Sequence, residues 1–114
     1  MQITSYASSE KMKNPHGINA CKLYDTRFAE MIHISLAPGE ALVKHITPVD
    51  AVFYVLEGEA SIEIGDEQEI VKADSLVNSP QGIPHRISNN SKQSLRVLVI
   101  KLPRPTEKTV IIKE

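Results

Sequence analysis

Two histidines, His45 and His85, are the side chains of this sequence best placed for chemistry. Each lies a few residues after a glycine turn, Gly39 for the first and Gly82 for the second, among strand-forming residues. Neutral imidazole binds metals and makes hydrogen bonds, and pockets commonly form at the mouths of barrels. We therefore expect both histidines to face one cavity.

The residues around the histidines predict strands. In residues 59–64 apolar and polar side chains alternate, so that Ala60, Ile62 and Ile64 share one face. No stretch has the apolar period of an amphipathic helix. The apolar stretches are separated by turn residues at Pro38-Gly39, Gly58, Gly65-Asp66, Ala73-Asp74, Pro80-Gln81-Gly82 and Asn89-Asn90-Ser91. This pattern predicts an all-β barrel or sandwich.

Two segments, residues 51–56 and 95–102, are apolar at both strand parities apart from Arg96 and Lys101. A strand of this kind must be covered on both faces. We expect the barrel interior to cover one face and another layer or a partner subunit to cover the other, which predicts a homodimer. Residues 109–112 are short and β-branched, and they are expected to add an edge strand.

The composition predicts one soluble domain and excludes several classes of partner. The chain has 114 residues, with 13 Lys and Arg against 14 Asp and Glu, and no basic block. This balance gives no basis for binding nucleic acid or an anionic membrane. The longest apolar run is too short to cross a bilayer, and the first residues lack a secretion-signal pattern. A cytoplasmic location is expected, with the single cysteine, Cys21, in the core.

Seven residues around the two histidines resemble the cupin family. The family's first motif is G-x5-H-x-H-x3/4-E-x6-G, and its second is G-x5-P-x-G-x2-H-x3-N. The matching residues here are Gly39, His45, Gly58, Pro80, Gly82, His85 and Asn89. The resemblance covers about residues 30–102 and implies a cupin-type double-stranded β-helix, a jelly-roll barrel, in one domain spanning residues 1–114. It leaves an N-terminal arm, residues 1–17, and a C-terminal extension, residues 103–114. The arm and residues 109–112 are expected to cross between subunits of a dimer.

Two of the family's metal ligands are replaced in this sequence. Thr47 stands where the second histidine of the first motif belongs, and Ala51 where its glutamate belongs. The resemblance therefore implies that only His45 and His85 remain to bind a divalent metal such as iron, manganese, zinc or nickel. Two imidazoles are a poor site by themselves, because catalytic sites usually supply three protein ligands. Asp50 completes the set only if its strand bulges.

Three further polar residues are given other roles. His33 alternates with Ile32 and Ile34 on a predicted strand, so it is expected to face outward or towards a partner. His16 lies in the polar N-terminal segment and is expected in solvent. Asp74 replaces a glycine of the second motif, and aspartate tolerates the left-handed turn required there.

Three functions are compatible with these residues. The first is a barrel that binds a small, mostly apolar molecule without a tightly held metal. The second, implied by the resemblance, is a dioxygenase- or isomerase-like enzyme whose metal, held by His45 and His85, polarises the substrate. The third is a dimeric scaffold or interaction protein. The pocket residues expected for the first function are His45, Thr47, Phe53, Val55, His85 and Ile87.

Overall fold

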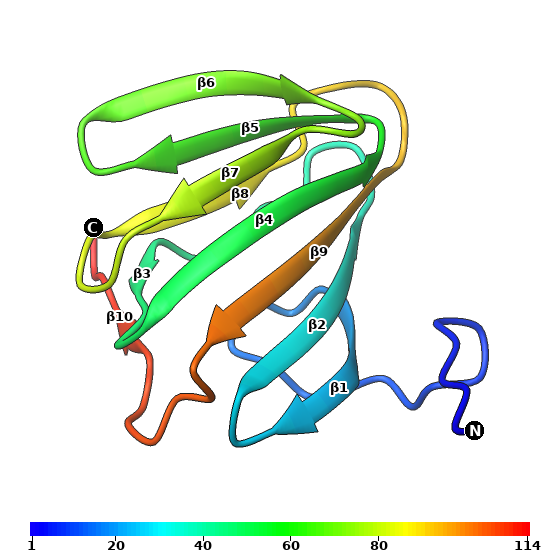
Figure 1. The fold of residues 1–114 in the computed structure, drawn as a ribbon. Helices are drawn as coiled ribbons and strands as arrows, with labels where there is room; N and C mark the ends of the chain where they lie inside the picture. Colours follow the sequence, from blue (N-terminus) through cyan, green and yellow to red (C-terminus); the bar gives the residue numbers. More distant parts are fainter.

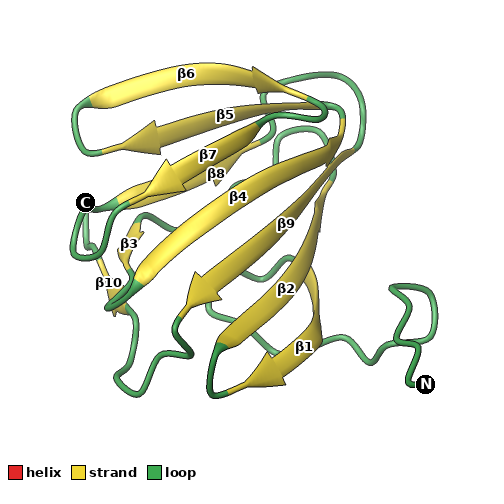
Figure 2. Cartoon of the chain, viewed as in Figure 1, coloured by secondary structure: helices red, strands yellow, loops and turns green.

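The computed structural model describes all 114 residues as ten strands joined by turns and loops (Figure 1). The strands are β1 (Asn19–Thr26), β2 (Ala29–Leu36), β3 (His45–Ile46), β4 (Asp50–Glu57), β5 (Glu59–Ile64), β6 (Glu67–Lys72), β7 (Leu76–Ser79), β8 (His85–Ser88), β9 (Leu95–Leu102) and β10 (Val110–Ile111). Figure 2 shows strands and loops only, so the all-β prediction is confirmed. No helix suited to crossing a membrane is present.

The strands form two five-stranded antiparallel sheets. We call the sheet with the order β1-β2-β9-β4-β7 the front sheet, and the sheet with the order β10-β3-β8-β5-β6 the back sheet. Because successive side chains of a strand point to opposite faces, every second residue of each sheet enters the space between them. The fifteen buried apolar residues of that core are Ile18, Ala20, Ile32, Ile34, Leu36, Leu42, Ala51, Phe53, Val55, Ala60, Ile62, Ile87, Leu95, Val97 and Val99.

Turns with left-handed backbone connect the strands. Asp74 has φ of 66°, which confirms that aspartate can replace glycine there, and its backbone N–H donates to the Val55 carbonyl. Gly58 has φ of 85°, and a Cβ at this position would collide with the Ser94 carbonyl oxygen. Glycine is therefore required between β4 and β5 for two reasons, its backbone angle and its closeness to residue 94.

Both ends of the chain pack on the barrel. In the N-terminal segment, the backbone N–H of Met12 donates to the Ala20 carbonyl, which holds residues 12–18 beside β1. Near the C-terminus, β10 pairs with β3 at the edge of the back sheet, and this confirms the predicted edge strand. Each segment has a binding place on its own barrel, so neither needs exchange between subunits to be held in position.

Candidate functional site

A cavity of about 180 Å³ opens between the N-terminal segment and the barrel. Its apolar wall consists of Met12, Ile18, Ala20, Ile32, Ile34, Leu42 and Val99. The other lining residues are Lys13, Asn14, Pro15, His16, His45, Lys101 and Thr109. The cavity thus combines seven apolar lining residues with several polar and charged ones.

His45 and His85 lie directly opposite each other on β3 and β8. The sequence predicts that both face one cavity, and this pairing brings the two rings close together. Their Nε2 atoms are 2.9 Å apart, and their rings meet edge to face. His45 Nδ1 is 2.7 Å from the Val43 carbonyl oxygen, and His85 Nδ1 is 2.6 Å from Ser79 Oγ. Every ring nitrogen of the pair therefore has a hydrogen-bond partner.

These contacts define the tautomers of both rings. A carbonyl oxygen only accepts, so His45 Nδ1 carries the hydrogen and, in the neutral ring, His45 Nε2 accepts. His85 Nε2–H then donates to His45, which leaves His85 Nδ1 to accept from the Ser79 hydroxyl. Thr47 Oγ1, 3.1 Å from His85 Nε2, is a second acceptor for that hydrogen.

Burial keeps both rings neutral near pH 7. It lowers the pKa of His85 from 6.5 to about 3, with smaller contributions from His45, Lys101 and His16. Burial also lowers the pKa of His45, against the opposing effect of its hydrogen bond to the Val43 carbonyl. The hydrogen-bond directions derived for neutral rings therefore apply at neutral pH.

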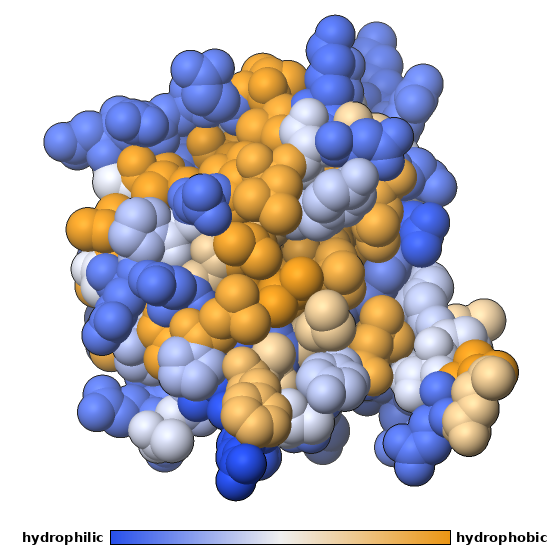
Figure 3. All heavy atoms as spheres, in the orientation of Figure 1, coloured by the Kyte–Doolittle hydropathy of each residue, from blue (hydrophilic) through white to orange (hydrophobic).

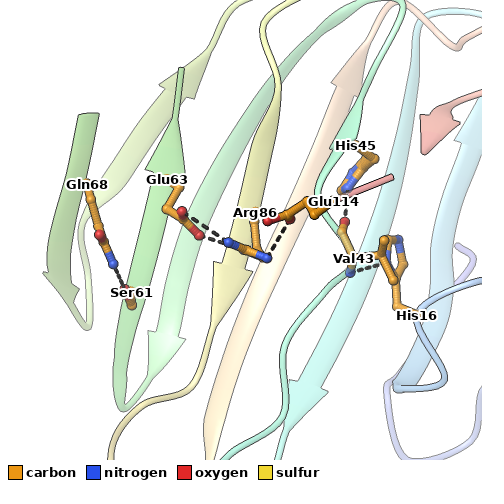
Figure 4. Close-up of polar contacts among 8 residues, drawn as sticks. All are labelled: His16, Val43, His45, Ser61, Glu63, Gln68, Arg86 and Glu114. Carbon is orange, nitrogen blue, oxygen red and sulfur yellow. Dashed lines mark hydrogen bonds and ion pairs between the residues drawn. The ribbon is translucent and has the colours of Figure 1, made fainter. Parts of the chain in front are cut away.

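The prediction that His16 lies in solvent is wrong. Its ring is half-buried, lines the cavity and lies 4.9 Å from the His45 ring, centroid to centroid. His16 Nδ1 accepts a 2.8 Å hydrogen bond from the Val43 N–H, and His45 Nδ1 bonds to the Val43 carbonyl, so the backbone of Val43 connects two imidazoles (Figure 4). Burial, followed by the charges of His45 and Lys101, lowers the pKa of His16 to about 4.

A tight loop carries His16 to this position. Asn14 Oδ1 accepts from the backbone N–H groups of His16 and Ile18, at 3.1 and 3.3 Å. Asn14 Nδ2 donates to the carbonyls of Met12 and Ile18. An asparagine followed by proline is a local turn signal, and Asn14-Pro15 could have indicated the loop. The loop's docking site on residue 43 is distant in sequence and gave no such signal.

The predicted pocket residues other than His45 do not line this cavity. Thr47, Phe53, Val55, His85 and Ile87 are all buried, but none belongs to its wall. The reason is that these side chains pack against one another inside the barrel; the rings of His85 and Phe53, for example, meet edge to face with centroids 5.1 Å apart. The cavity lies beyond this packed region, under the N-terminal segment.

The residues present do not fit a resident metal. The Nε2 atoms that would bind it are hydrogen-bonded to each other, and no group of three or more His, Cys, Asp or Glu side chains is arranged as a metal site. Asp50 does not complete the set: it is exposed, and its Oδ1 accepts from the Gln81 backbone N–H at 2.8 Å. Thr47 supplies only a neutral hydroxyl, already in contact with His85.

His33 faces outward from the barrel, as its parity predicts, yet it is only 1% exposed. Tyr6 of the N-terminal arm stacks on it with ring centroids 3.9 Å apart, and Arg96 Nε donates to His33 Nε2. Cys21 is paired with His33 across β1 and β2 and is also buried. The cysteine is fully buried, as expected for a core residue, and it lies on the same face of the front sheet as His33.

The two sheets, the buried histidine pair and the short turn-rich strands define a double-stranded β-helix barrel. Comparison with known proteins gives the family: the cupin domain family matches residues 32–101, and the chain belongs to it. The resemblance inferred from the motif residues is thus confirmed.

Curated relatives show a partial match. The chain is 33% identical over 67 residues to the tetracenomycin polyketide synthase protein TcmJ of Streptomyces glaucescens, a match covering 58% of this chain and 45% of that protein. The chain thus spans less than half of TcmJ. An uncharacterised protein of Methanocaldococcus jannaschii is 27% identical over 85 residues, 74% of this chain and 73% of that protein.

Solved structures share the fold over the whole barrel. The TT1209 structure from Thermus thermophilus has a TM-score of 0.79 and 27% identity, covering 92% of this chain and all of that one. The polyketide cyclase RemF from Streptomyces resistomycificus has a TM-score of 0.84 at 18% identity, covering 100% of this chain and 87% of that one. At 18% identity the likeness to RemF shows the fold alone.

Proposed function

We propose that this cupin binds a small, mostly apolar molecule in the cavity beneath its N-terminal segment, without a resident metal. The observation that carries the proposal is the cavity itself: about 180 Å³, with seven hydrophobic residues among the fourteen that line it. Apolar cavities of about 150 Å³ bind single-ring molecules such as benzene. A ligand built on one ring is therefore the size that the cavity supports.

The name of one relative supports a ligand derived from a polyketide. TcmJ, 33% identical to this chain over 67 residues, is called a polyketide synthase protein. A ring derived from a polyketide would place its carbon skeleton against the apolar wall and its oxygens against the polar lining. The hydrogen-bonded state of His45 and His85 favours binding over metal-dependent catalysis, since neither ring has a free lone pair for a metal.

Thermal unfolding with two sets of additives tests this proposal. Single-ring aromatic compounds are expected to raise the Tm by mass action, whereas Fe²⁺, Mn²⁺, Zn²⁺ and Ni²⁺ are expected to leave it unchanged. Thr109→Phe, which narrows the cavity, should abolish the stabilisation, and Thr106→Phe on the same tail, outside the lining, should keep it. A rise in Tm with a metal that disappears in His45→Ala would overturn the proposal in favour of the metal-dependent enzyme.

We also propose that the outer face of the front sheet pairs with a second copy of the chain. Eight apolar or aromatic side chains share this face: Met31, Val52, Tyr54, Leu56, Leu76, Leu98, Ile100 and Leu102. Figure 3 shows apolar atoms spread continuously over it, and Leu76 and Leu102 are 53% and 42% exposed. Monomers rarely leave so large an apolar area in water.

The size and centre of this face support a second copy as the occupant. Four strands of eight residues and one of four, about 4.8 Å apart and with about 3.3 Å per residue, cover roughly 570 Å². This is near the lower end of the area that each partner contributes to a standard interface, about 800 Å² on average. The middle strand of the sheet is β9. A two-fold axis through β9 would lay one front sheet over the other with both faces covered.

Light scattering coupled to size exclusion tests the pairing. The expected mass is twice the 12.6 kDa of the chain. Leu98→Glu, at the centre of the face, should give a folded monomer. Ile70→Glu, at a 58% exposed position on β6 of the back sheet, should remain a dimer. A monomeric wild-type protein would contradict the proposal.

A further inference from the structure

The charges at the cavity identify the class of ligand more closely. We infer that the cavity binds a single-ring monocarboxylate, with the ring against the apolar wall and the carboxylate beside Lys101. This inference rests on the proposed small-molecule function and adds the charge and polarity of the ligand.

Positive charge exceeds negative charge around Lys101. Its Nζ lies 3.6 Å from Glu30 Oε1, but the other oxygen of Glu30 is 3.3 Å from Lys22 Nζ. Lys22 also contacts Asp25, which in turn pairs with Arg104. Three cations therefore share two carboxylates, and one positive charge in this network lacks its own partner.

Lys101 is the cation of this network that belongs to the cavity. It is in the lining, and its side chain is only 16% exposed. A second lining cation, Lys13, makes no ion pair. No carboxylate is among the fourteen lining residues, and Glu30, which pairs with Lys101, lies outside the lining.

The hydrogen-bonding groups of the lining also favour an anionic ligand. His16 Nδ1 already accepts from Val43, so the neutral ring keeps its hydrogen on Nε2 as a donor. His45 uses Nδ1 on the Val43 carbonyl and Nε2 on His85. Asn14 uses both its oxygen and its amide nitrogen within its own loop. The lining thus offers N–H donors and has few free acceptors, which suits a ligand oxygen that only accepts.

Of the two lining cations, Lys13 is exposed to solvent and only Lys101 is largely covered. One covered cation beside a compact apolar wall favours one carboxylate on one ring, since each buried negative charge must be paired and the second charge of a phosphate or a dicarboxylate would have no covered cation. An uncharged ring would contact the apolar wall, but it would give the Lys101 ammonium no partner in addition to Glu30. A monocarboxylate matches both parts of the cavity.

Titration calorimetry with benzoate and benzamide tests the inference, because the two probes have the same ring and differ in charge. At pH 8 and low salt, benzoate is expected to bind about tenfold more tightly than benzamide, the effect of one charge-assisted hydrogen bond. Lys101→Met keeps the aliphatic stem and should remove this preference. Lys72→Met, on β6 and away from the cavity, should retain it.

A variant with the opposite expected effect makes the test stricter. Glu30→Gln removes the carboxylate that competes for Lys101 and should strengthen benzoate binding several-fold, with benzamide unaffected. Equal binding of the two probes, or a benzoate preference that survives in Lys101→Met, would overturn the monocarboxylate inference alone. If neither probe binds and no other single-ring compound raises the Tm, the proposed function fails with it.

Discussion

The front and back sheets have five strands each and share one core, but their outer faces are of opposite character. The front sheet is apolar on its outer side, whereas the back sheet has an ion-pair row there: Arg86 joins Glu63 at 2.6 Å and Glu114 at 2.9 Å (Figure 4). A strand that is apolar on one face is suited to water on the other, and a strand apolar on both faces is not. Burial of the inner face in the core therefore does not account for the apolar side chains on the outer face of the front sheet.

The largest effect on stability is expected when residues on the inner and outer faces of β4 are replaced one at a time. Phe53, on the inner face of β4, is 1% exposed, while its neighbour Tyr54 points outward and is half-buried. In the monomeric Leu98→Glu background, Phe53→Ala should reduce the free energy of unfolding by about 3–5 kcal/mol, as for other buried aromatics. Tyr54→Ala should cost clearly less. Urea unfolding measures both, and equal losses would contradict the assignment of faces.

A second prediction concerns the inner face of the back sheet and its response to acid. The folded state keeps the pKa of His85 at about 3, against 6.5 when unfolded. Unfolding at pH 5 therefore takes up a proton, so the stabilisation is complete above pH 6.5 and is lost as the pH falls towards 3. Linkage gives a loss of about 2 kcal/mol at pH 5.

The replacement His85→Gln should make this pH dependence weaker. Urea unfolding at about pH 7 and pH 5 gives the two stabilities for each protein, and the difference should shrink by about 2 kcal/mol in the variant. An unchanged difference would show that His85 is not the group responsible.

The smallest effect is expected on the outer face of the back sheet. Arg86→Met removes the contacts with Glu63 and Glu114, but all three side chains are partly exposed to solvent. A loss of about 0.5–1 kcal/mol is expected, and it should diminish in about 1 M salt because exposed charges are screened. The same replacement costing several kcal/mol would mean that this face is covered, like the front one.

Much of this fold follows from local patterns in the sequence. The alternation in residues 59–64, the left-handed Asp74 and the terminal edge strand each depend on a few neighbouring residues, and each is confirmed. The motif spacing predicts that His45 and His85 face one cavity; the two residues are paired, but only His45 lines the cavity. The apolar character of both faces of β4 and β9 is visible in the sequence, but what covers the outer face is not.

The cavity was harder to predict because its wall depends on contacts between distant segments. His16 reaches it through a loop that docks on Val43, far away in sequence. Which of the inward side chains line free space, and which fill the core, depends on the summed volumes of neighbours from both sheets. Sequence parity places Phe53 and Val55 inside, yet it does not distinguish a packed interior from a cavity wall.

The two hydrogen bonds made by the Val43 backbone affect the reactivity of the histidines. Its N–H occupies the lone pair of His16, and its carbonyl takes the hydrogen of His45, whose own lone pair is held by His85. Ser79 occupies the lone pair of His85. The barrel therefore brings together three imidazoles, none of which has a free lone pair: before any of them could take a proton from a bound molecule, one of these hydrogen bonds would have to break.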